Sequence, residues 1–328
     1  MAHAPTMLFS VVIPVYNRAA LVGATLDSVL GQEFEGEFEV VVVDDGSTDE
    51  TPAVLARYGG RVRVLRQENA GPGAARNLGI GSARGEYVAF LDSDDLWFPW
   101  TLSTYDEIIR THARPAFVAG GVTEFSAEAR FSPPPKSPLK EVRLEDYYAS
   151  SSHSWWLQLG AVVVRRDVFL EVGGFTNASI NAEDSDLWLK LGTAKGFVHF
   201  SSPPVYAYRR HPASAVSNSR KTLEGIQYLI SEEKAGRYPG GAARRAERLE
   251  LLTRHVRPVS LACLERGEFR RAWQLYRATL WWHARLGRAR YAAAFPLLAC
   301  RAAVRHNLKQ TRSFEAQTSE VSCHLNHP

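Results

Sequence analysis

Short apolar runs alternate with helical patterns along the first third of the chain. The apolar runs cover residues 8–13, 38–43, 62–65 and 87–91. Each run is continuous rather than alternating, which is typical of a strand buried on both faces. Between them, residues 22–30, 51–58 and 71–82 place apolar side chains on one helical face. This alternation predicts an α/β domain with a mostly parallel sheet flanked by helices.

The rest of the chain divides into an irregular stretch and a helical stretch. Residues 117–154 show no regular pattern, whereas residues 160–164 form a fifth apolar run. Residues 184–191 have helical spacing, and from Leu223 onward the spacing predicts helices alone. We expect the last residues, 311–328, to be disordered because they are polar and lack periodicity.

The composition is that of an ordinary globular protein, with 45% hydrophobic and 23% charged residues. No apolar run approaches the ~20 residues needed to span a bilayer. Met1 to Phe9 lack the basic start and the apolar stretch of a secretory signal. The three cysteines have neither metal-ligand spacing nor a disulfide framework. A cytoplasmic location is therefore expected.

Charge is distributed unevenly along the chain. From Arg220 to the end there are 20 Lys and Arg against 9 Asp and Glu, and the preceding part has 19 against 26. In this basic region tryptophans and arginines interleave, as in residues 279–285, which suits contact with a membrane surface. A helical subdomain with a solvated basic face is the alternative. Nucleic-acid binding is not expected, because no known binding module is visible.

Five carboxylates follow two of the predicted strands. Asp44 and Asp45 come directly after the second strand, and Asp92, Asp94 and Asp95 come after the fourth. Turns or helix caps explain each cluster taken alone. Because parallel strands end at one edge, where ligands bind in open α/β sheets, we expect all five to converge there. Their mutual repulsion and their oxygen ligands predict a bound divalent cation such as Mg²⁺ or Mn²⁺.

Four short motifs occur in a fixed order in this part of the chain. They are residues 12–17 (VIPVYN), 42–49 (VVDDGSTD), 71–77 (GPGAARN) and 91–95 (LDSDD). Together they resemble the signature of family 2 glycosyltransferases, which have the GT-A fold. The resemblance continues through residues 173–175 (GGF) and 183–189 (EDSDLWL) and ends near residue 211. It implies a metal-dependent enzyme that transfers a sugar from a nucleotide-sugar, by default a UDP-sugar, with inversion.

The resemblance also implies a domain organisation. Residues 1–218 would form the GT-A catalytic domain, with the nucleotide-sugar site in residues 8–115 and the acceptor and base half in residues 116–218. Residues 219–310 would form a basic helical region, before the tail from residue 311.

The nucleotide-sugar site implied by the resemblance draws on all four motifs. Its residues would be Pro14, Tyr16, Asn17, Asp44, Asp45, Arg76, Asp92 and Ser93. Tyr16 would stack on the base, and Asp44 would accept a base N–H or a ribose hydroxyl. Arg76 lies just inside a helix opened by glycines, which allow a backbone to approach an anion closely.

The same resemblance implies a metal site and a catalytic base. Asp94 would ligate the divalent metal that bridges the diphosphate, and His211 would reach the metal or the diphosphate. Asp184 would be the general base that deprotonates the acceptor hydroxyl, with Glu183 orienting the acceptor or its loop. Without the resemblance, placement of acids at a helix N-terminus explains these last two residues better.

Four further residues are weaker candidates. Asp95 is a spare carboxylate, and Arg209 could meet a phosphate. Trp155 and Trp156 could form a platform for the acceptor sugar, although packing in the core explains them equally well.

The predicted function is sugar transfer to a saccharide or a lipid-linked acceptor, in the synthesis of a cell-surface polysaccharide or a glycolipid. The protein would work in the cytoplasm, in contact with the inner face of the membrane through its helical region. A phosphoryl-transferring enzyme is a rival, but it would need a lysine-bearing phosphate loop, and the sequence has none. A degenerate nucleotide-sugar-binding protein is the other alternative, and the presence of every expected acid argues against it.

Overall fold

The computed structural model describes residues 7–126, 131–210 and 219–324, with side chains up to residue 306. The chain forms two compact units. The first comprises Met1–Gly225 and Tyr238–Arg244, and the second comprises Ile226–Arg237 and Arg245–Pro328. Helix α7 (Ser219–Lys234) contributes to both units, so the boundary expected after residue 218 lies seven residues before the observed one.

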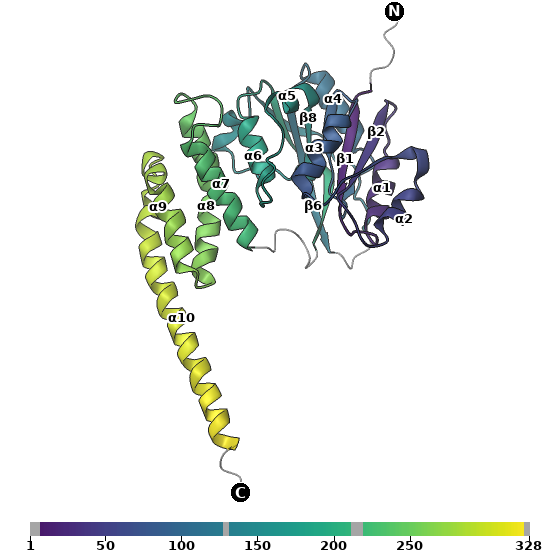
Figure 1. Ribbon diagram of the computed structural model, residues 1–328. Coiled ribbons are helices and arrows are strands. Elements are labelled where there is room, and N and C mark those ends of the chain that lie inside the picture. Colours follow the sequence, from purple (N-terminus) through teal and green to yellow (C-terminus); the bar gives the residue numbers. More distant parts are fainter. Residues whose placement is uncertain (1–6, 127–130, 211–218, 325–328) are drawn as a thin grey trace, which may run out of the picture. The chain divides into compact units, whose positions relative to one another are not determined.

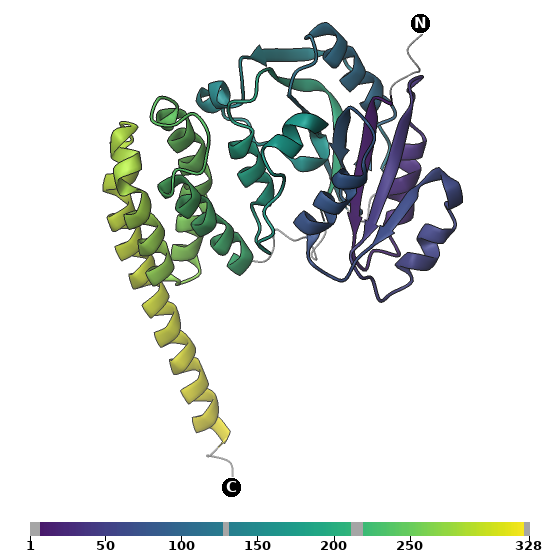
Figure 2. The same ribbon diagram turned by 45° about the horizontal axis from the view of Figure 1, so that its top comes forward.

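A single sheet, nine-stranded in the described residues, forms the centre of the first unit (Figures 1 and 2). Its order is β3-β2-β1-β4-β8-β6-β9-β5, and β7 pairs with β9. The strands are β1 (Phe9–Val15), β2 (Phe38–Asp44), β3 (Arg63–Arg66), β4 (Tyr87–Phe90), β5 (Leu96–Trp97), β6 (Phe117–Ser126), β7 (Lys140–Leu144), β8 (Val162–Arg165) and β9 (Phe197–Arg210). The first four strands are parallel, as expected. The other half is mixed, because β5, β7 and β8 run antiparallel to their neighbours.

Helices cover this sheet. They are α1 (Val22–Leu30), α2 (Thr51–Ala56), α3 (Pro72–Ser82), α4 (Thr101–Thr111), α5 (Arg166–Glu171) and α6 (Glu183–Lys190). The predicted helices are confirmed within a few residues at their ends. The sequence analysis did not predict α4, which buries Leu102, Tyr105, Ile108 and Ile109 while its other positions are polar.

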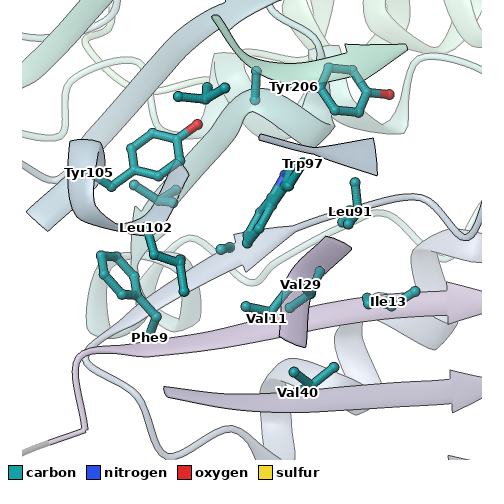
Figure 3. Close-up of a cluster of buried hydrophobic side chains, with 14 of the residues drawn as sticks. Phe9, Val11, Ile13, Val29, Val40, Leu91, Trp97, Leu102, Tyr105 and Tyr206 are labelled. Atoms are coloured by element: carbon teal, nitrogen blue, oxygen red, sulfur yellow. The ribbon is translucent and has the colours of Figure 1, made fainter. Parts of the chain in front are cut away.

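The core lies where the first strands meet the later ones. Figure 3 shows Val11, Ile13 and Val40 from β1 and β2 near Trp97 and Tyr206. Strands β1 and β2 are buried on both faces, which explains their unbroken runs of valine and isoleucine. The predicted end of the first strand at residue 13 was two residues too early, because β1 passes through its proline and pairs with β2 up to residue 15.

The expectation of an irregular stretch at residues 117–154 was wrong. It contains the ten-residue strand β6 and the strand β7. Gly120 and Gly121 interrupt the apolar run in the middle of β6, and the register with β9 shifts at this point. A Cβ atom on Gly120 would lie 2.4 Å from Val205 Cγ2, and one on Gly121 would lie 2.6 Å from the Ser201 carbonyl oxygen. The two glycines are therefore required by close packing, and they hide the strand pattern.

The second unit is helical, as predicted. Besides its part of α7 it contains α8 (Arg245–Glu265), α9 (Phe269–Arg285) and α10 (Ala289–His324). Tyr276 of α9 stacks on Phe295 of α10 with ring centres 4.3 Å apart. Arg248 forms a buried ion pair with Glu233 at 2.7 Å. Helix α10 continues to His324, whereas the sequence indicated disorder from residue 311, and no described helix is both long and apolar enough to cross a bilayer.

Helix α3 approaches the sheet through a glycine, and this generates a test of the packing. A Cβ atom on Gly79 would lie 2.5 Å from Val12 Cγ1 and 3.1 Å from Val43 Cγ2, in a sheet whose valines cannot move away. We expect Gly79→Ala to lower the free energy of unfolding by about 1–3 kcal/mol through overpacking, as measured by urea unfolding.

Gly81, two residues further along α3, is the matched control. A Cβ atom there meets no other atom within 4 Å. Gly81→Ala should stabilise the protein by about 0.4–1 kcal/mol, because alanine has a higher helix propensity than glycine. Equal effects at the two positions would show that α3 does not pack as closely as described.

Candidate active site

The sheet brings the two acidic segments to one edge. Strand β1 is parallel to both β2 and β4, so the carboxyl ends of β2 and β4 point the same way. Strand β2 ends at Asp44, and β4 ends two residues before Asp92. The edge predicted from the sequence is therefore present. The acids on it nevertheless have different partners, which assign them different tasks.

Asp44 and Asp45 brace the loops that follow their strand. Asp44 Oδ1 accepts a hydrogen bond from the backbone N–H of Ser47 at 2.8 Å. Asp45 Oδ1 accepts from the N–H of Ala70 at 2.9 Å, and Asp45 Oδ2 accepts from the N–H of Gly71 at 2.9 Å. Both side chains are buried. Asp45 therefore fixes the loop that leads into α3, whereas the second oxygen of Asp44, which the nucleoside contact expected of it would use, forms an ion pair with Arg66 at 3.4 Å.

Tyr16 and Asn17 form the turn after β1. Asn17 has a backbone φ of +50°, a conformation that asparagine tolerates better than most residues. Its Oδ1 accepts from the N–H of Thr48 at 2.8 Å, so it also braces the neighbouring loop. Tyr16 is 43% exposed, and its ring is accessible for stacking. Pro14, by contrast, lies buried in the sheet opposite Val43 rather than in an open pocket.

Arg76 joins the two acidic motifs that the sequence could only treat separately. Its side chain is 5% exposed, and its Nη2 donates to Asp92 Oδ1 at 2.6 Å while its Nη1 donates to Glu183 Oε1 at 3.1 Å. Burial works to lower the pKa of Arg76, but the two carboxylates hold it above its usual value. A permanently charged guanidinium thus connects the end of β4 with the start of α6.

The three acids after β4 point in different directions. Asp94 forms an ion pair with Arg18 Nε at 3.1 Å. Ser93, which lies between Asp92 and Asp94 in the sequence, is buried. Asp95 faces the core, where it accepts hydrogen bonds from the Tyr206 hydroxyl and, at 2.7 Å, from the Arg209 N–H. Burial raises the pKa of Asp95 to about 8. Asp95 therefore supports the fold instead of facing a ligand.

The five carboxylates lie at the predicted edge of the sheet but do not form one set of ligands. Among the described residues, no group of three or more His, Cys, Asp or Glu side chains is arranged to hold a metal ion. Asp92 and Asp94 do supply carboxylate oxygens on the same turn, and the side chain of Asp92 is 38% exposed. Two such oxygens fit a hard cation that takes its other ligands from phosphates and water. His211 lies outside the described residues.

Asp184 lies at the beginning of α6, next to the ion pair of Arg76. Its Oδ1 accepts from the Ser185 N–H at 2.6 Å and from Ser185 Oγ at 3.2 Å. Burial, followed by the negative charge of Glu183, raises the pKa of Asp184 to about 6. A carboxylate with this pKa is ionised at neutral pH and can still accept a proton, which suits a general base.

A cavity of about 210 Å³ opens beside Glu183. One wall is the start of α3, and the opposite wall is the loop of residues 176–181 together with Lys221 of α7. Lys221 Nζ donates to Ser179 Oγ at 3.1 Å across this wall. Glu183, Lys221 and the side chains of Thr176, Asn177, Ser179 and Asn181 contribute polar groups to its lining, and these groups can bond to the hydroxyls of a ligand.

This arrangement matches known proteins. Residues 10–164 match the family described as "Glycosyl transferase family 2". An uncharacterized glycosyltransferase of Rickettsia typhi is 29% identical over 231 residues, which cover 68% of this chain and 70% of the relative. The poly(ribitol-phosphate) β-N-acetylglucosaminyltransferase TarS of Staphylococcus aureus is 40% identical over 111 residues, 32% of this chain and 19% of that longer protein.

A solved structure agrees with these relatives. Residues 1–349 of S. aureus TarS, in complex with UDP-GlcNAc, superpose on this chain with a TM-score of 0.61 and 25% identity, covering 76% of this chain and 73% of the other. The chain therefore contains a glycosyl transferase family 2 domain in residues 10–164. Its first unit has the GT-A fold, with a helical region after it.

The remaining candidate site residues of this glycosyltransferase lie in different environments. Arg209 Nε donates to the Asp94 carbonyl oxygen at 2.7 Å, and its guanidinium lies 4.6 Å from the centre of the Phe125 ring. Trp155 stacks between His153 and His199, with ring centres 4.0 Å from each. Burial lowers the pKa of His199 to about 4, so Trp155 stacks on a neutral imidazole there. Trp156 is 55% exposed.

Sequence reasoning missed three residues of this glycosyltransferase site. Arg18 pairs with Asp94, Phe175 lies under the Arg76 guanidinium at 5.5 Å, and Lys221 lines the cavity. Arg18 directly follows the first motif and Phe175 ends the Gly-Gly-Phe element, so proximity to motifs was a usable signal for both. Lys221 carries no such signal, because it lies in the helical region, 37 residues after Asp184, the last acid of the site.

The buried ion pairs of Arg76 predict that substitution by lysine destabilises the protein more at this position than at an exposed arginine. Arg76→Lys keeps the charge, but one ammonium group cannot reproduce both hydrogen bonds, so one buried carboxylate loses its partner. We expect the free energy of unfolding to fall by about 1–3 kcal/mol, measured by urea unfolding. Arg84→Lys is the control, because Arg84 is 66% exposed in its pair with Glu39 and should change stability by less than about 1 kcal/mol. Equal losses would contradict the bridge.

The raised pKa of Asp184 predicts its titration. Carboxyl-carbon NMR of a ¹³C-aspartate-labelled sample should show Asp184 titrating near pH 6, where an ordinary aspartate is fully ionised. Because the charge of Glu183 contributes to this shift, Glu183→Gln should lower the pKa of Asp184. An unchanged pKa of Asp184 in Glu183→Gln would assign the shift to burial alone. An ordinary aspartate pKa in the unmodified protein would contradict the predicted shift.

Proposed function

We propose that the protein is an inverting glycosyltransferase that moves a sugar from a UDP-sugar to a hydroxyl group of a saccharide or a lipid-linked acceptor. The observation that supports this proposal is the Arg76 bridge, because it connects Asp92 at the end of β4 with Glu183, which precedes Asp184 in α6 and lines the cavity. The likeness to TarS in complex with UDP-GlcNAc supports the choice of a UDP-sugar.

Three side chains and the backbone at the start of α3 would bind the donor. The exposed ring of Tyr16 stacks on the base, and Asp44, whose Oδ2 pairs with Arg66 in this structure, accepts a hydrogen bond from the nucleoside when the donor is bound. Arg18, drawn to Asp94 in this structure, is free to turn toward a diphosphate because its side chain is 30% exposed. The backbone at Gly71 and Gly73 approaches the ligand closely at the start of α3, where a helix favours anions.

Asp92 and Asp94 would hold a divalent cation, Mg²⁺ or Mn²⁺, together with the diphosphate. Such a cation neutralises the charge that develops on the departing nucleoside diphosphate. Arg76 keeps the Asp92 carboxylate oriented from its buried side, and Arg209 holds the Asp94 backbone through its carbonyl oxygen. The protein thus positions both carboxylates before any ligand arrives.

Asp184 would act as the general base. Its carboxylate accepts the proton of the acceptor hydroxyl while that oxygen forms a bond to the anomeric carbon and the bond to the nucleoside diphosphate breaks. A single displacement on the face opposite the leaving group inverts the anomeric configuration. Ser185 holds the carboxylate through Oδ1, which leaves Oδ2 for the proton.

The acceptor would enter from the cavity beside Glu183, whose lining offers hydroxyl, amide and ammonium groups to a sugar. The product would belong to a cell-surface polysaccharide or a glycolipid. We place the reaction in the cytoplasm, at the inner face of the membrane. A catalytically degenerate sugar-nucleotide-binding protein is the competing function, and the raised pKa of Asp184, which serves a base and not a binding site, favours the enzyme.

Thermal unfolding with UDP and UDP-GlcNAc, each with and without Mn²⁺, tests this function. A ligand at 100 times its Kd adds about 2.7 kcal/mol to stability, which is easily seen as a rise in Tm. We expect a Mn²⁺-dependent rise in the unmodified protein and in Asp184→Asn, and none in Asp94→Ala. The unmodified protein should release UDP from UDP-GlcNAc, whereas Asp184→Asn should bind the nucleotide-sugar without releasing UDP.

Two outcomes would overturn the proposal. A folded, Mn²⁺-loaded protein whose Tm does not respond to any of UDP, GDP or dTDP has no donor site. A protein that binds the nucleotide-sugar but releases UDP at the same rate with and without Asp184 is a binding protein, not an enzyme using this base.

A further inference from the structure

The helical unit contains a long segment without any acidic residue. Residues 269–306 include eight arginines and no aspartate or glutamate. Two of these arginines find acids outside the segment, since Arg271 pairs with Glu268 and Arg288 pairs with Glu250. The other six form no ion pair with the part of the chain that the structure describes. They are Arg270, Arg277, Arg285, Arg290, Arg301 and Arg305.

Helix α10 carries an apolar stripe on its solvent side. Ala293, Leu297, Cys300 and Val304 are all exposed, and their spacing of four, three and four residues places them on one helical face. Leu297 is 67% exposed and Val304 is 59% exposed, which is unusual for large apolar side chains. The opposite face of α10 packs on α9 through residues such as Phe295 (Figure 1).

Arginines lie along one border of this stripe. At 100° per residue, Arg290, Arg301 and Arg305 fall next to the apolar positions and are exposed as well. We call the seven residues Arg290, Ala293, Leu297, Cys300, Arg301, Val304 and Arg305 the outer face of α10. Apolar side chains bordered by arginines, on a helix without acids, form the amphipathic pattern of helices that lie in a lipid interface.

We propose that the outer face of α10 docks on an anionic lipid bilayer surface. Charge decides between the possible occupants: a second copy of the chain would bring arginines against arginines, whereas anionic headgroups complement them. Leucine and valine enter the upper acyl region while the long arginine side chains reach up to the phosphates. Trp281 of α9, which is 81% exposed, is the kind of aromatic residue found at the level of the headgroups. This inference does not depend on the transfer chemistry.

Co-sedimentation of the full chain with vesicles tests the docking. We expect binding to vesicles of roughly one-third phosphatidylglycerol in phosphatidylcholine, weak binding to phosphatidylcholine alone, and weakening with added salt. Each arginine at the surface is worth about fivefold in affinity, so Arg290→Gln/Arg301→Gln/Arg305→Gln should bind at least tenfold more weakly. Arg57→Gln/Arg110→Gln/Arg143→Gln, which removes the same charge from exposed positions of the first unit, should bind normally.

Cys300 allows contact between the outer face of α10 and the bilayer to be measured directly, because Cys300 is exposed within that face while Cys263 is buried. In a Cys323→Ser background, an environment-sensitive fluorophore on Cys300 should shift to the blue with anionic vesicles. Leu297→Gln/Val304→Gln should abolish that shift while keeping the circular dichroism and the nucleotide-dependent rise in Tm of the parent.

Three results would overturn the proposal. They are an absence of binding to either kind of vesicle, equal loss of binding in the two triple variants, and a dimer in analytical ultracentrifugation that Leu297→Gln/Val304→Gln dissociates. The last result would assign the outer face to a second copy of the chain. Loss of nucleotide response with retained vesicle binding would instead count against the proposed transferase alone.

Discussion

The arrangement of the site depends on one buried cation. A guanidinium that is almost inaccessible to water is unfavourable unless carboxylates satisfy it, and Arg76 takes one carboxylate from the end of β4 and one from the start of α6. Three elements must therefore meet around it. Helix α3 is held at the correct depth by Gly79 and at its start by Asp45, so Arg76 is presented from a rigid support.

The other acids of the sheet edge show how the same residue type serves two purposes. Asp44, Asp45 and Asp95 spend most of their hydrogen-bonding capacity on backbone N–H groups and a tyrosine hydroxyl. Asp92 pairs with Arg76, and Asp94 pairs with Arg18. An acid that follows a strand has the same sequence signature in both cases, because a turn and a ligand site both favour aspartate there. Only the positions of the hydrogen-bond donors in the folded protein distinguish a structural aspartate from a ligand-binding one.

The sequence was sufficient where local patterns determine the structure. Continuous valine runs identified β1 and β2, and helical spacing identified α3 and the helical region. It failed where distant segments decide: β6 and β9 pair across some 80 residues, and the Arg76 partner in α6 is 107 residues away. Gly120 and Gly121 interrupt the pattern of β6 for a reason that only the packed neighbours reveal. The length of α10 was likewise hidden, because its last turns lack an apolar period.

The loop that forms one wall of the proposed acceptor cavity has consequences for changing the acceptor range. It is tied at its beginning by Asn77, which bonds both backbone groups of Phe175, and at its end by the Lys221 carbonyl, which accepts from the Asn181 N–H. Residues 177–179 between these anchors are exposed. Replacing them would change one wall of the cavity without altering the residues of the proposed donor site or the proposed base. These residues are therefore suitable positions for engineering acceptor specificity.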